Sequence, residues 1–376
     1  MKIKILHISK DLVGGIGTVI VSLIKSFNNH EFSSESLIWD NPIVKNSIII
    51  KVITKYLLLK KNITNNIDYH ILHFHGGFTP HIMLMNKFKN KPILLSPHGA
   101  LDQTSLKKSK LKKILVKYLF MKKAYQSANC IHALTNKEAK DIKCYGIKDV
   151  PIAIIPNGID MDVTLGLNQE LKIKLLSLAK GKKIILSLSR LHISKGIDIL
   201  IEAFTKVYEI NKDIVLFIVG AGDEEYEAQL GNKIKDLKQE NNIFLLGEMI
   251  NNDKNTLYDI SNIFVLPSFN EGFPLTVLEA YRQNVPVITT TATPFEPISK
   301  IGCGWYVEPT VDGIYLALKD ASLLSKSELK VKGNIGHEWI KNNYSLNAIM
   351  KMYEELYLWL INNSEKPNFV YEGIKK

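Results

Sequence analysis

Two glutamates eight positions apart form the most informative pattern in this sequence. Glu271 precedes a Gly-Phe-Pro tripeptide, and Glu279 lies within the apolar run that comes next. The short apolar run 263–266 predicts a buried strand, and residues 275–281 predict a helix. Pro274 suits the first helical position, because its missing N–H is one of those that a helix leaves unpaired. We therefore expect Glu271 on the loop at the helix N-terminus and Glu279 one to two turns inside.

This pattern favours a ligand that carries both phosphates and hydroxyls. The free backbone N–H groups at a helix N-terminus form a site for an anion. A carboxylate beside an anion site is useful when the ligand also offers hydroxyls to it, as a sugar nucleotide does. Paired carboxylates also serve glycoside hydrolases, where they flank the bond that breaks. Hydrolase carboxylates come more often from separate strand ends than from one loop and helix.

A pair of cations follows another expected strand. The strand 184–188 ends just before Arg190, Lys195 comes five residues later, and a helix is expected to start near Gly196. Two cations beside a helix N-terminus can clamp a diphosphate. The alternative is a pair of ordinary surface cations. The sequence holds only two arginines, Arg190 and Arg282, and this scarcity favours a role for Arg190.

Histidines gather after two earlier strands. In the segment Ser-Pro-His-Gly-Ala-Leu-Asp, His98 directly follows the expected strand 93–96, which would point its ring to the end of the sheet. A structural histidine at a turn is the alternative. His73, His75 and His81 surround the end of the strand before it. Alternating histidines can ligate a metal, but no acidic or cysteine side chain lies nearby, so core or ligand-lining histidines are the commoner interpretation.

Glycines also follow strands in two places. Gly14-Gly15-Ile16-Gly17 follows the first strand and opens a helix, and Gly220 and Gly222 follow the strand 214–219. Such loops let the backbone approach a phosphate or a sugar closely. They are not the full G-x-G-x-x-G fingerprint, and a tight structural turn is an equally good interpretation of both.

Short apolar strands alternate with helical stretches in two series along the chain. This alternation predicts parallel, doubly wound sheets in two Rossmann-like domains that join somewhere in residues 157–180. Ligands bind at the carboxyl ends of the strands of such sheets. A helix is expected at 347–362, and the polar tail after Ser364 is expected to fray. The expected strands are 3–8, 71–74, 93–96, 130–134, 153–155, 184–188, 214–219, 243–246, 263–266 and 287–289.

Composition sets limits on the class of protein. The chain has 376 residues, enough for two ordinary α/β domains. No run approaches the roughly 20 apolar residues that span a bilayer, and the first residues carry no signal-peptide pattern. The three cysteines are scattered, which argues against a disulfide framework. We therefore expect a cytoplasmic protein.

The formal net charge of +11 is unevenly distributed. Eight lysines lie between Lys107 and Lys123, among apolar residues that recur at helical spacing. A basic amphipathic helix can contact an anionic membrane surface. A docked helix with a solvated lysine face explains the pattern equally well. No recognised motif for nucleic acid accompanies the charge, so we expect no nucleic-acid partner.

Taken together, these segments resemble the retaining glycosyltransferases of family 4, which have the GT-B fold. The resemblance rests on His98-Gly99, on Arg190 with Lys195, and on the Glu-x7-Glu motif of Glu271 and Glu279. Residues 155–160, Ile-Pro-Asn-Gly-Ile-Asp, match a further landmark of the family. The resemblance implies two Rossmann-like domains facing a cleft. Residues 1–165 would form the acceptor side, residues 166–345 would bind the nucleotide sugar, and a C-terminal helix, 346–376, would cross back onto the first domain.

The resemblance also implies roles for individual residues. His98 and Glu271 would touch the transferred sugar and are the expected catalytic residues. Arg190 and Lys195 would neutralise the pyrophosphate in place of a metal. His75 and, less directly, Asp102 would lie on the acceptor side. The segment around Gly247 would hold the base through its backbone, and Glu279 would contact the ribose hydroxyls. The full donor-binding set would be Gly15, Gly17, Arg190, Lys195, Gly247, Phe273, Pro274, Leu275, Thr276 and Glu279.

The implied enzyme is a retaining glycosyltransferase that needs neither metal nor cofactor. It would move a hexosyl or N-acetylhexosaminyl group from a UDP- or GDP-sugar to a hydroxyl of a lipid-linked glycan. The pathway would be bacterial surface polysaccharide biosynthesis, such as O-antigen of lipopolysaccharide or capsule, at the inner face of the plasma membrane. Asp160 and Asp162 spell the Asp-x-Asp of metal-dependent glycosyltransferases, but they fall in the expected linker.

Two other functions remain open on the sequence. A GT-B sugar-nucleotide epimerase would act on the nucleotide sugar without any acceptor. A non-catalytic, membrane-associated protein could keep the fold and lose the reaction. In that case alanine at Glu271 or Lys195 would leave its cellular activity intact.

Overall fold

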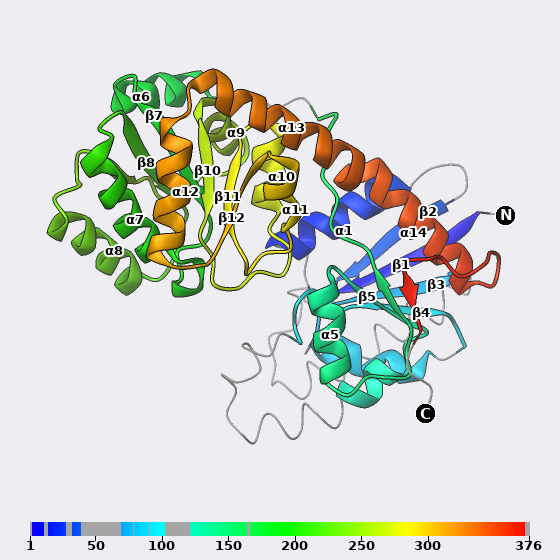
Figure 1. The fold of residues 1–376 in the computed structure, drawn as a ribbon. Coiled ribbons are helices and arrows are strands. Elements are labelled where there is room, and N and C mark those ends of the chain that lie inside the picture. The colour runs from blue at the N-terminus through cyan, green and yellow to red at the C-terminus, as the bar shows by residue number, and fades with distance from the viewer. Residues whose placement is uncertain are drawn as a thin grey trace. The chain divides into compact units, whose positions relative to one another are not determined.

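The computed structural model describes residues 2–10, 14–27, 32–38, 69–77, 79–88, 90–101, 121–163 and 166–372. Within these residues the chain forms two compact units. Unit 1 comprises residues 1–158 and 346–376, and unit 2 comprises residues 159–345. Each unit is built on one sheet, and Figure 1 traces both along the chain.

The sheet of unit 1 has the order β13-β6-β5-β4-β3-β1-β2, and all pairs are parallel except that of β13 with β6. Its central strands are buried on both faces, which explains why most of their residues are apolar. The strand order reverses between β1 and β3, because β2 lies on the far side of β1. The strands are β1 (Ile3–Ser9), β2 (Phe32–Ile38), β3 (Ile71–His75), β4 (Ile93–Ser96), β5 (Cys130–Ala133), β6 (Ile152–Ile154) and β13 (Val370–Tyr371).

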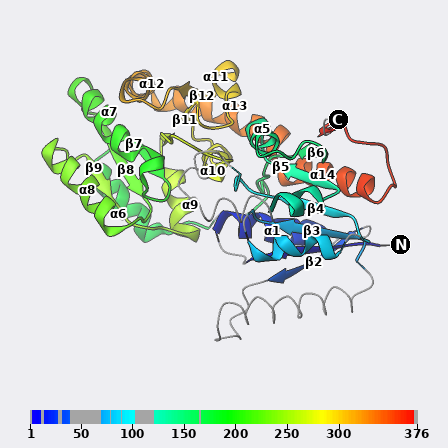
Figure 2. The ribbon, with the colours of Figure 1, turned by 90° about the horizontal axis from the view of Figure 1, so that it is seen from below.

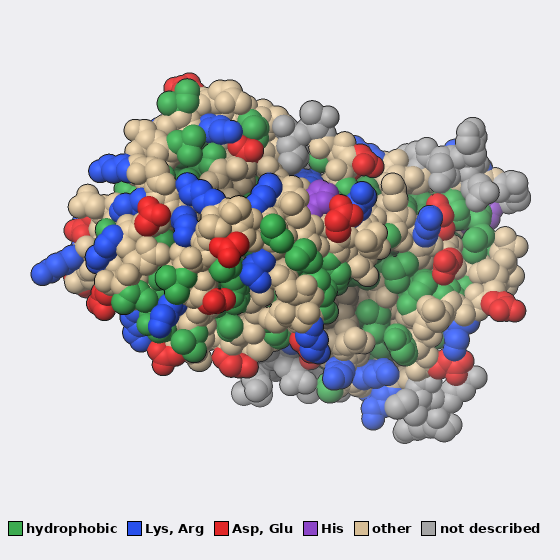
Figure 3. Space-filling model, turned by 45° about the horizontal axis from the view of Figure 1, so that its top comes forward, with side chains coloured by type: hydrophobic (Ala, Val, Ile, Leu, Met, Phe, Trp, Pro, Cys, Tyr) green, Lys and Arg blue, Asp and Glu red, His purple; other side chains and the backbone are tan. Residues whose placement is uncertain are grey.

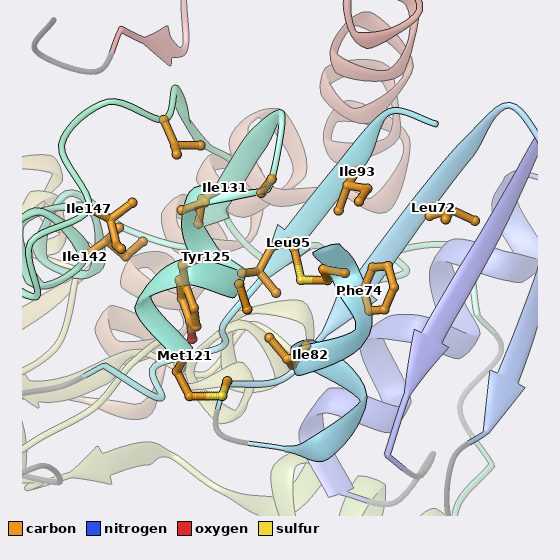
Figure 4. Close-up of a cluster of buried hydrophobic side chains, with 14 of the residues drawn as sticks. Leu72, Phe74, Ile82, Ile93, Leu95, Met121, Tyr125, Ile131, Ile142 and Ile147 are labelled. Carbon is orange, nitrogen blue, oxygen red and sulfur yellow. The ribbon is translucent and has the colours of Figure 1, made fainter. Parts of the chain in front are cut away.

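Helices cover both faces of this sheet (Figures 1 and 2). One face packs against α1 (Gly14–Phe27) and α14 (Leu346–Leu360), whose Tyr353 and Tyr357 are buried there. Figure 4 shows the core on the other face, where Phe74 and Leu95 meet Tyr125 and Met121. The elements on that face are the 3-10 helix η1 (Pro80–Lys87), a helical segment at 121–126 and α5 (Asn136–Cys144).

The C-terminal region confirms one expectation and corrects another. Helix α14 follows unit 2 in the sequence but belongs to unit 1, as the resemblance implies. For the described residues 365–372, the prediction that the tail after Ser364 frays is wrong. Val370 and Tyr371 pair antiparallel with Ala153 and Ile152 of β6 and so add an edge strand to the sheet. Val370 is buried in the α14 core, and this apolar contact holds the polar tail in place.

The sheet of unit 2 has the order β12-β11-β10-β7-β8-β9, and all of its pairs are parallel. The order reverses between β7 and β10, which is the arrangement of a doubly wound nucleotide-binding domain. All six residues of β8 are buried. The strands are β7 (Lys183–Leu188), β8 (Ile214–Val219), β9 (Ile243–Leu245), β10 (Ile263–Leu266), β11 (Val287–Thr290) and β12 (Gly304–Val307).

Helices also cover both faces of the second sheet. On one face lie α7 (Ile197–Ile210), α8 (Glu224–Asp236) and α12 (Val311–Leu323). On the other lie α6 (Gln169–Ala179), α9 (Asn251–Ile260), α10 (Leu275–Arg282) and α13 (Lys326–Tyr344). A 3-10 turn, η2 (Ile193–Lys195), and a short helix, α11 (Pro297–Ile301), complete the unit.

The surface and the helices bear on the membrane question. No helix among the described residues is long and apolar enough to cross a membrane. On the face in Figure 3, lysine side chains are dispersed among acidic ones and do not form one continuous patch. The basic stretch at 107–120 lies outside the described residues. Of the lysines expected to form it, Lys122 is half-buried and Lys123 is exposed.

Candidate active site

The site residues of unit 2 lie on the loops that follow β7 and β10. These two strands flank the point where the strand order of the sheet reverses. Loops that follow the strands at such a point diverge and leave room for a ligand at the carboxyl ends. Arg190 and Lys195 follow β7, and Glu271 follows β10. The topology therefore brings two patterns that are far apart in the sequence to one end of the sheet.

Lys195 ends the η2 turn and forms an ion pair with Glu271. Its Nζ lies 2.6 Å from Glu271 Oε1, and the two side chains are 13% and 10% exposed. Glu271 Oε1 also accepts a hydrogen bond from Ser268 Oγ at 2.7 Å. Gly196 follows Lys195 with a φ of +66°, and a Cβ there would lie 2.3 Å from the carbonyl oxygen of Pro267. Only glycine allows this approach, so the turn that aims Lys195 depends on Gly196.

Arg190 leaves β7 with an exposed side chain. Within the part of the chain that the structure describes, its guanidinium makes no hydrogen bond or ion pair. An unpaired guanidinium keeps its five donors for a ligand. Arg282, the other arginine, has a structural role, because its Nη1 donates to the carbonyl oxygen of Asp160 at 3.1 Å.

The N-terminus of α10 differs in one detail from the expectation. Pro274 is the capping residue before the helix, with extended backbone, and Leu275 is the first helical residue. The expected first helical position for Pro274 is therefore wrong by one residue. The N–H groups of Leu275 and Thr276 precede the first intrahelical hydrogen bond and stay available to an anion.

Phe273 has a packing role beside its place on the loop. Its ring centroid lies 5.2 Å from that of Phe295 and 5.8 Å from that of Tyr344. The backbone of this loop is held from both sides, since Phe269 N donates to Ser194 O at 2.9 Å and Glu271 N donates to Ala292 O at 3.3 Å. These contacts fix the loop backbone that presents Glu271.

Glu279 lies on α10 with two partners that the sequence did not reveal. Its Oε1 lies 2.7 Å from Lys254 Nζ, and its Oε2 accepts from Tyr258 Oη at 3.1 Å. Both partners come from α9. Burial raises the pKa of Tyr258 well above its usual value, and the Glu279 charge adds to this, so the phenol stays a donor. No motif marks Lys254 or Tyr258, since only the packing of α9 beside the site brings them to Glu279.

The glycines after β8 and β9 bring two backbones together. Gly220 N donates to Gly247 O at 2.8 Å. Gly247 is exposed and has a φ of +73°, which favours glycine. A Cβ on Gly220 would lie only 1.8 Å from Ser189 O, so this loop requires glycine. The close approach places the β7, β8 and β9 loops next to one another.

In unit 1, His75 and His98 lie at the ends of neighbouring strands. β3 ends at His75, and His98 follows β4 in a turn with a φ of +53°, an uncommon angle for a residue with a side chain. His75 Nδ1 and His98 Nε2 are 3.0 Å apart. Burial lowers the pKa of His98 to about 3 and holds that of His75 well below its usual range. Both rings are therefore neutral at physiological pH.

Glu138 anchors the backbone beside His98, although no sequence pattern indicated it. Its Oε1 accepts from Gly99 N at 2.6 Å, and its Oε2 accepts from Leu134 N at 2.8 Å. The side chain is 6% exposed, and burial raises the pKa of its carboxyl while the two N–H groups partly oppose this. Glu138 therefore ties the turn after β4 to the loop after β5.

The structure gives fewer contacts for the glycines of α1 and for the aspartates that the sequence analysis considered. Gly15 and Gly17 lie in the first turn of α1, and Gly17 is buried. Asp102 lies outside the described residues. Asp160 Oδ1 accepts from the Asp162 backbone N–H at 3.0 Å, so one carboxylate of the Asp-x-Asp sequence closes a turn.

The histidine group is larger than the sequence indicated. His81 does not join it, because its Nε2 donates to the carbonyl oxygen of His75 at 2.9 Å. His7 of β1 joins instead, and one ring nitrogen from each of His7, His73 and His75 lies within 4.8 Å of the others. Both ring nitrogens of His73 already have partners, Tyr357 Oη at 2.8 Å and Ser96 Oγ at 2.7 Å. Both ring nitrogens of His75 also have partners, His7 Nδ1 at 2.9 Å and His98 Nε2 at 3.0 Å, so hydrogen bonds occupy all four ring nitrogens of His73 and His75.

Comparison with known families matches both units. Residues 168–343 match the model of glycosyl transferases group 1, and residues 36–163 match that of glycosyltransferase family 4. The two ranges together cover most of the chain. The solved structure of sucrose-phosphate synthase from Thermosynechococcus elongatus aligns over 96% of this chain and 100% of its own, with a TM-score of 0.77 and 17% identity. At that identity the likeness shows a shared fold.

Curated relatives agree with the family models. An uncharacterized glycosyltransferase of Methanocaldococcus jannaschii is 30% identical over 69% of this chain and 63% of its own length. An Escherichia coli UDP-Gal:alpha-D-GlcNAc-diphosphoundecaprenol alpha-1,3-galactosyltransferase is 29% identical over 72% of this chain and 66% of its own. The match thus spans slightly less than two thirds of each of these relatives. With both units matched in order along the chain, the protein belongs to glycosyltransferase family 4 and has the GT-B fold.

Proposed function

We propose that the protein is a retaining, metal-independent glycosyltransferase. It takes a nucleotide-diphosphate sugar and transfers the sugar to a hydroxyl group of a lipid-linked glycan during surface polysaccharide biosynthesis. The observation that carries the proposal is the cluster at the carboxyl ends of β7 and β10. Lys195, Glu271 and an unpaired Arg190 lie there beside the free N–H groups of α10. The cations and N–H donors of this set can bind a diphosphate. Its carboxylate can accept hydrogen bonds from sugar hydroxyls.

The reaction needs stabilisation of the charge that develops on the departing diphosphate. Arg190 and Lys195 supply two positive charges, and the N–H groups of Leu275 and Thr276 add two donors. Preorganised groups of this kind contribute the largest share of many rate enhancements, and removal of one donor typically costs about 100- to 1,000-fold in rate. Two cations at this place would do the work that a bound metal does elsewhere. UDP and GDP are the expected leaving groups.

Lys195 must exchange partners when the donor binds. In the structure Lys195 Nζ forms an ion pair with Glu271 Oε1 at 2.6 Å. A diphosphate would draw Lys195 away, and Glu271, still held by Ser268, would turn to the hydroxyls of the sugar. The ion pair thus keeps both groups neutralised and oriented before binding. Glu279, already oriented by Lys254 and Tyr258, would accept from the ribose hydroxyls.

Retention of configuration would follow from attack on the same face as the leaving group. The bond from the anomeric carbon to the diphosphate oxygen breaks, and the acceptor oxygen forms the new bond on that face. The acceptor proton passes to the departing phosphate oxygen, so no protein base is required. An oxocarbenium-like species would be short-lived between the two steps. Anomeric analysis of the product by NMR checks this part, and a sugar trapped covalently on Glu271 would overturn it.

One observation supports the choice of acceptor. The E. coli relative acts, by its name, on a diphosphoundecaprenol-linked sugar. A lipid-linked acceptor would hold the enzyme at the cytoplasmic face of the plasma membrane, where the lysines around 107–123 would meet anionic lipid.

The first experiment measures thermal stability with UDP, GDP, ADP and CMP, each with and without EDTA. A ligand at about 100 times its Kd adds roughly 2.7 kcal/mol, which gives a clear shift. We expect a shift with UDP or GDP that survives EDTA and disappears in Lys195→Ala. Lys206→Ala is the matched control, because Lys206 pairs with Asp312 on the exposed surface of the same unit.

Three other outcomes would contradict parts of the proposed function. A shift that depends on a divalent metal would contradict metal independence. No shift with any nucleotide would contradict the donor class. Conversion of a nucleotide sugar to its epimer without an acceptor would favour the epimerase.

A further inference from the structure

Three histidines form a continuous row from the core of unit 1 to the candidate active site. His7 Nδ1 lies 2.9 Å from His75 Nε2, and His75 Nδ1 lies 3.0 Å from His98 Nε2. Ring centroids are 5.2 Å and 5.3 Å apart, with interplanar angles of 26° and 14°. These values fit imidazoles that lie nearly in one plane and share N–H···N hydrogen bonds. The row begins at His7 Nε2, which is buried without a partner among the described residues.

All three rings are neutral. His7 and His75 are 0% and 2% exposed, and no carboxylate contacts either ring among the described residues. Burial lowers the pKa of His7 and His98 to about 3, and it holds that of His75 well below the usual range. Each ring therefore carries one N–H, with one nitrogen as donor and the other as acceptor.

This count of protons links the three tautomers. His75 has a hydrogen bond at each nitrogen, so it donates to one neighbour and accepts from the other. Both bonds must then run in the same direction along the row. Either all three rings carry the proton on Nδ1, or all three carry it on Nε2. The Nδ1 of His98, at the end of the row, is correspondingly a fixed donor or a fixed acceptor.

We propose that His7 and His75 are positioning residues that hold His98 in one orientation and one tautomer at the sugar site. The assignment of a sugar contact to His98 rests on the proposed function, whereas the shared tautomer does not. A ring held in this way meets a sugar hydroxyl with a defined donor or acceptor and needs no reorientation on binding.

A second row of hydrogen bonds lies beside the three histidines. His132 Nε2 lies 2.7 Å from the carbonyl oxygen of Ile155, which can only accept, so His132 donates there. Its Nδ1 then accepts from Ser96 Oγ, which in turn accepts from His73 Nε2, both at 2.7 Å. Tyr357 Oη completes the row by donating to His73 Nδ1 at 2.8 Å. The ring nitrogens of His73 and His132 therefore all have partners within this row, and none is left to bond to His75. The His75 ring packs against the row, with its centroid 4.0 Å from that of His73.

The test is ¹⁵N NMR of the full-length protein with labelled histidine, at pH 7. We expect His7, His75 and His98 each to show one protonated and one unprotonated nitrogen, unaveraged, with the same tautomer in all three. His98 titrating as an ordinary exposed histidine, or a mixture of tautomers along the row, would overturn the proposal. Stoichiometric zinc retained by the protein, with loss of these signals, would overturn it as well.

Variants then separate positioning from folding. His75→Phe should leave the His98 ring signals averaged between tautomers, and His7→Asn, which keeps an amide group near the place of Nδ1, should cause a smaller change. His337→Gln in unit 2 is the matched control and should leave the His98 signals unchanged. Averaging in the control, or an unchanged His98 in His75→Phe, contradicts the proposal.

Activity provides the second readout. His75→Phe should lower kcat roughly tenfold to a hundredfold, as expected for a misplaced reacting group, while the Kd for UDP or GDP stays unchanged because that site lies in unit 2. A changed Kd with unchanged kcat would overturn the positioning role. If the shared tautomer is found but His98→Ala transfers sugar normally, the sugar contact of the proposed function fails and the row of histidines stands.

Discussion

Acid should unfold unit 1 before unit 2, because buried histidines are concentrated in unit 1. His7, His73, His75 and His132 are at most 2% exposed. Burial lowers the pKa of His7 to about 3 and that of His132 to about 4, and it holds those of His73 and His75 well below the usual range. In the unfolded chain a histidine has a pKa of about 6.5. His98 is left out of the sum because it is only part-buried.

The sign of the effect follows from proton binding. Below about pH 6.5 the unfolded chain binds more protons than the folded chain, so the free energy of unfolding falls as the pH falls. Above pH 6.5 the full stability is present. Between pH 7.5 and 5.5 each histidine costs about 1.4 kcal/mol. Four of them cost about 5.5 kcal/mol, which is comparable to the whole stability of a typical domain.

Hydrogen exchange measured by mass spectrometry can follow the two units separately. After correction for the intrinsic exchange rate, protection of β3 and β4 should fall by about 10,000-fold between pH 7.5 and 5.5. Peptides from β7 and β10 are the internal control, because the histidines of unit 2, His192 and His337, are not buried.

Two results would refute this reasoning. Equal loss of protection in both units would mean that the histidines of unit 1 are not its cause. Protection of β3 and β4 that does not change with pH would mean that these histidines are already protonated or exposed. His7→Asn removes one of the four groups and should reduce the pH dependence by about a quarter.

Three further predictions concern single sites. Glu138→Gln should destabilise unit 1 by about 1–3 kcal/mol in urea unfolding, because an amide NH2 would face one of two buried N–H donors; unchanged stability would mean that the clamp on Gly99 is unimportant. In steady-state kinetics and calorimetry, Glu271→Gln should lower kcat with little change in the nucleotide Kd. Glu279→Gln should raise that Kd with a smaller change in kcat. The reverse pattern would assign Glu279 to the transferred sugar and Glu271 to the ribose. Gly220→Ala should destabilise unit 2 strongly in thermal unfolding, because its Cβ would lie 1.8 Å from Ser189 O. Gly231→Ala, in open space on α8, should be neutral or stabilising by up to about 1 kcal/mol. Similar effects of both substitutions would contradict the close approach of Gly220 to Ser189.

The sequence by itself was sufficient for features that depend on neighbouring residues. Short apolar runs between helical stretches determined two parallel, doubly wound sheets, since such strands are buried on both faces. The Glu-Gly-Phe-Pro segment determined a loop that leads into a helix, because proline and glycine impose local backbone angles. Pro274 shows the limit of this reasoning, since the segment is where the sequence predicts it and the helix starts one residue later.

Only the tertiary structure decided which side chains meet. Glu279 has Lys254 and Tyr258 as partners because α9 packs beside α10, and no periodic pattern records that choice. The polarity of the tail after Ser364 predicts fraying, yet pairing of Val370 and Tyr371 with β6 and burial of Val370 hold it. Strand pairing between distant segments depends on sheet order, which local patterns do not contain.

The histidines give the clearest example. The sequence marked His73, His75, His81 and His98 by their closeness to strand ends. It could not indicate His7, because that residue reaches His75 only through the register of β1 beside β3, in which His7 lies opposite His73. Nor could it exclude His81, which bonds to the backbone instead. Residue types fixed what chemistry was available, and the parallel register of the strands fixed which groups share a proton.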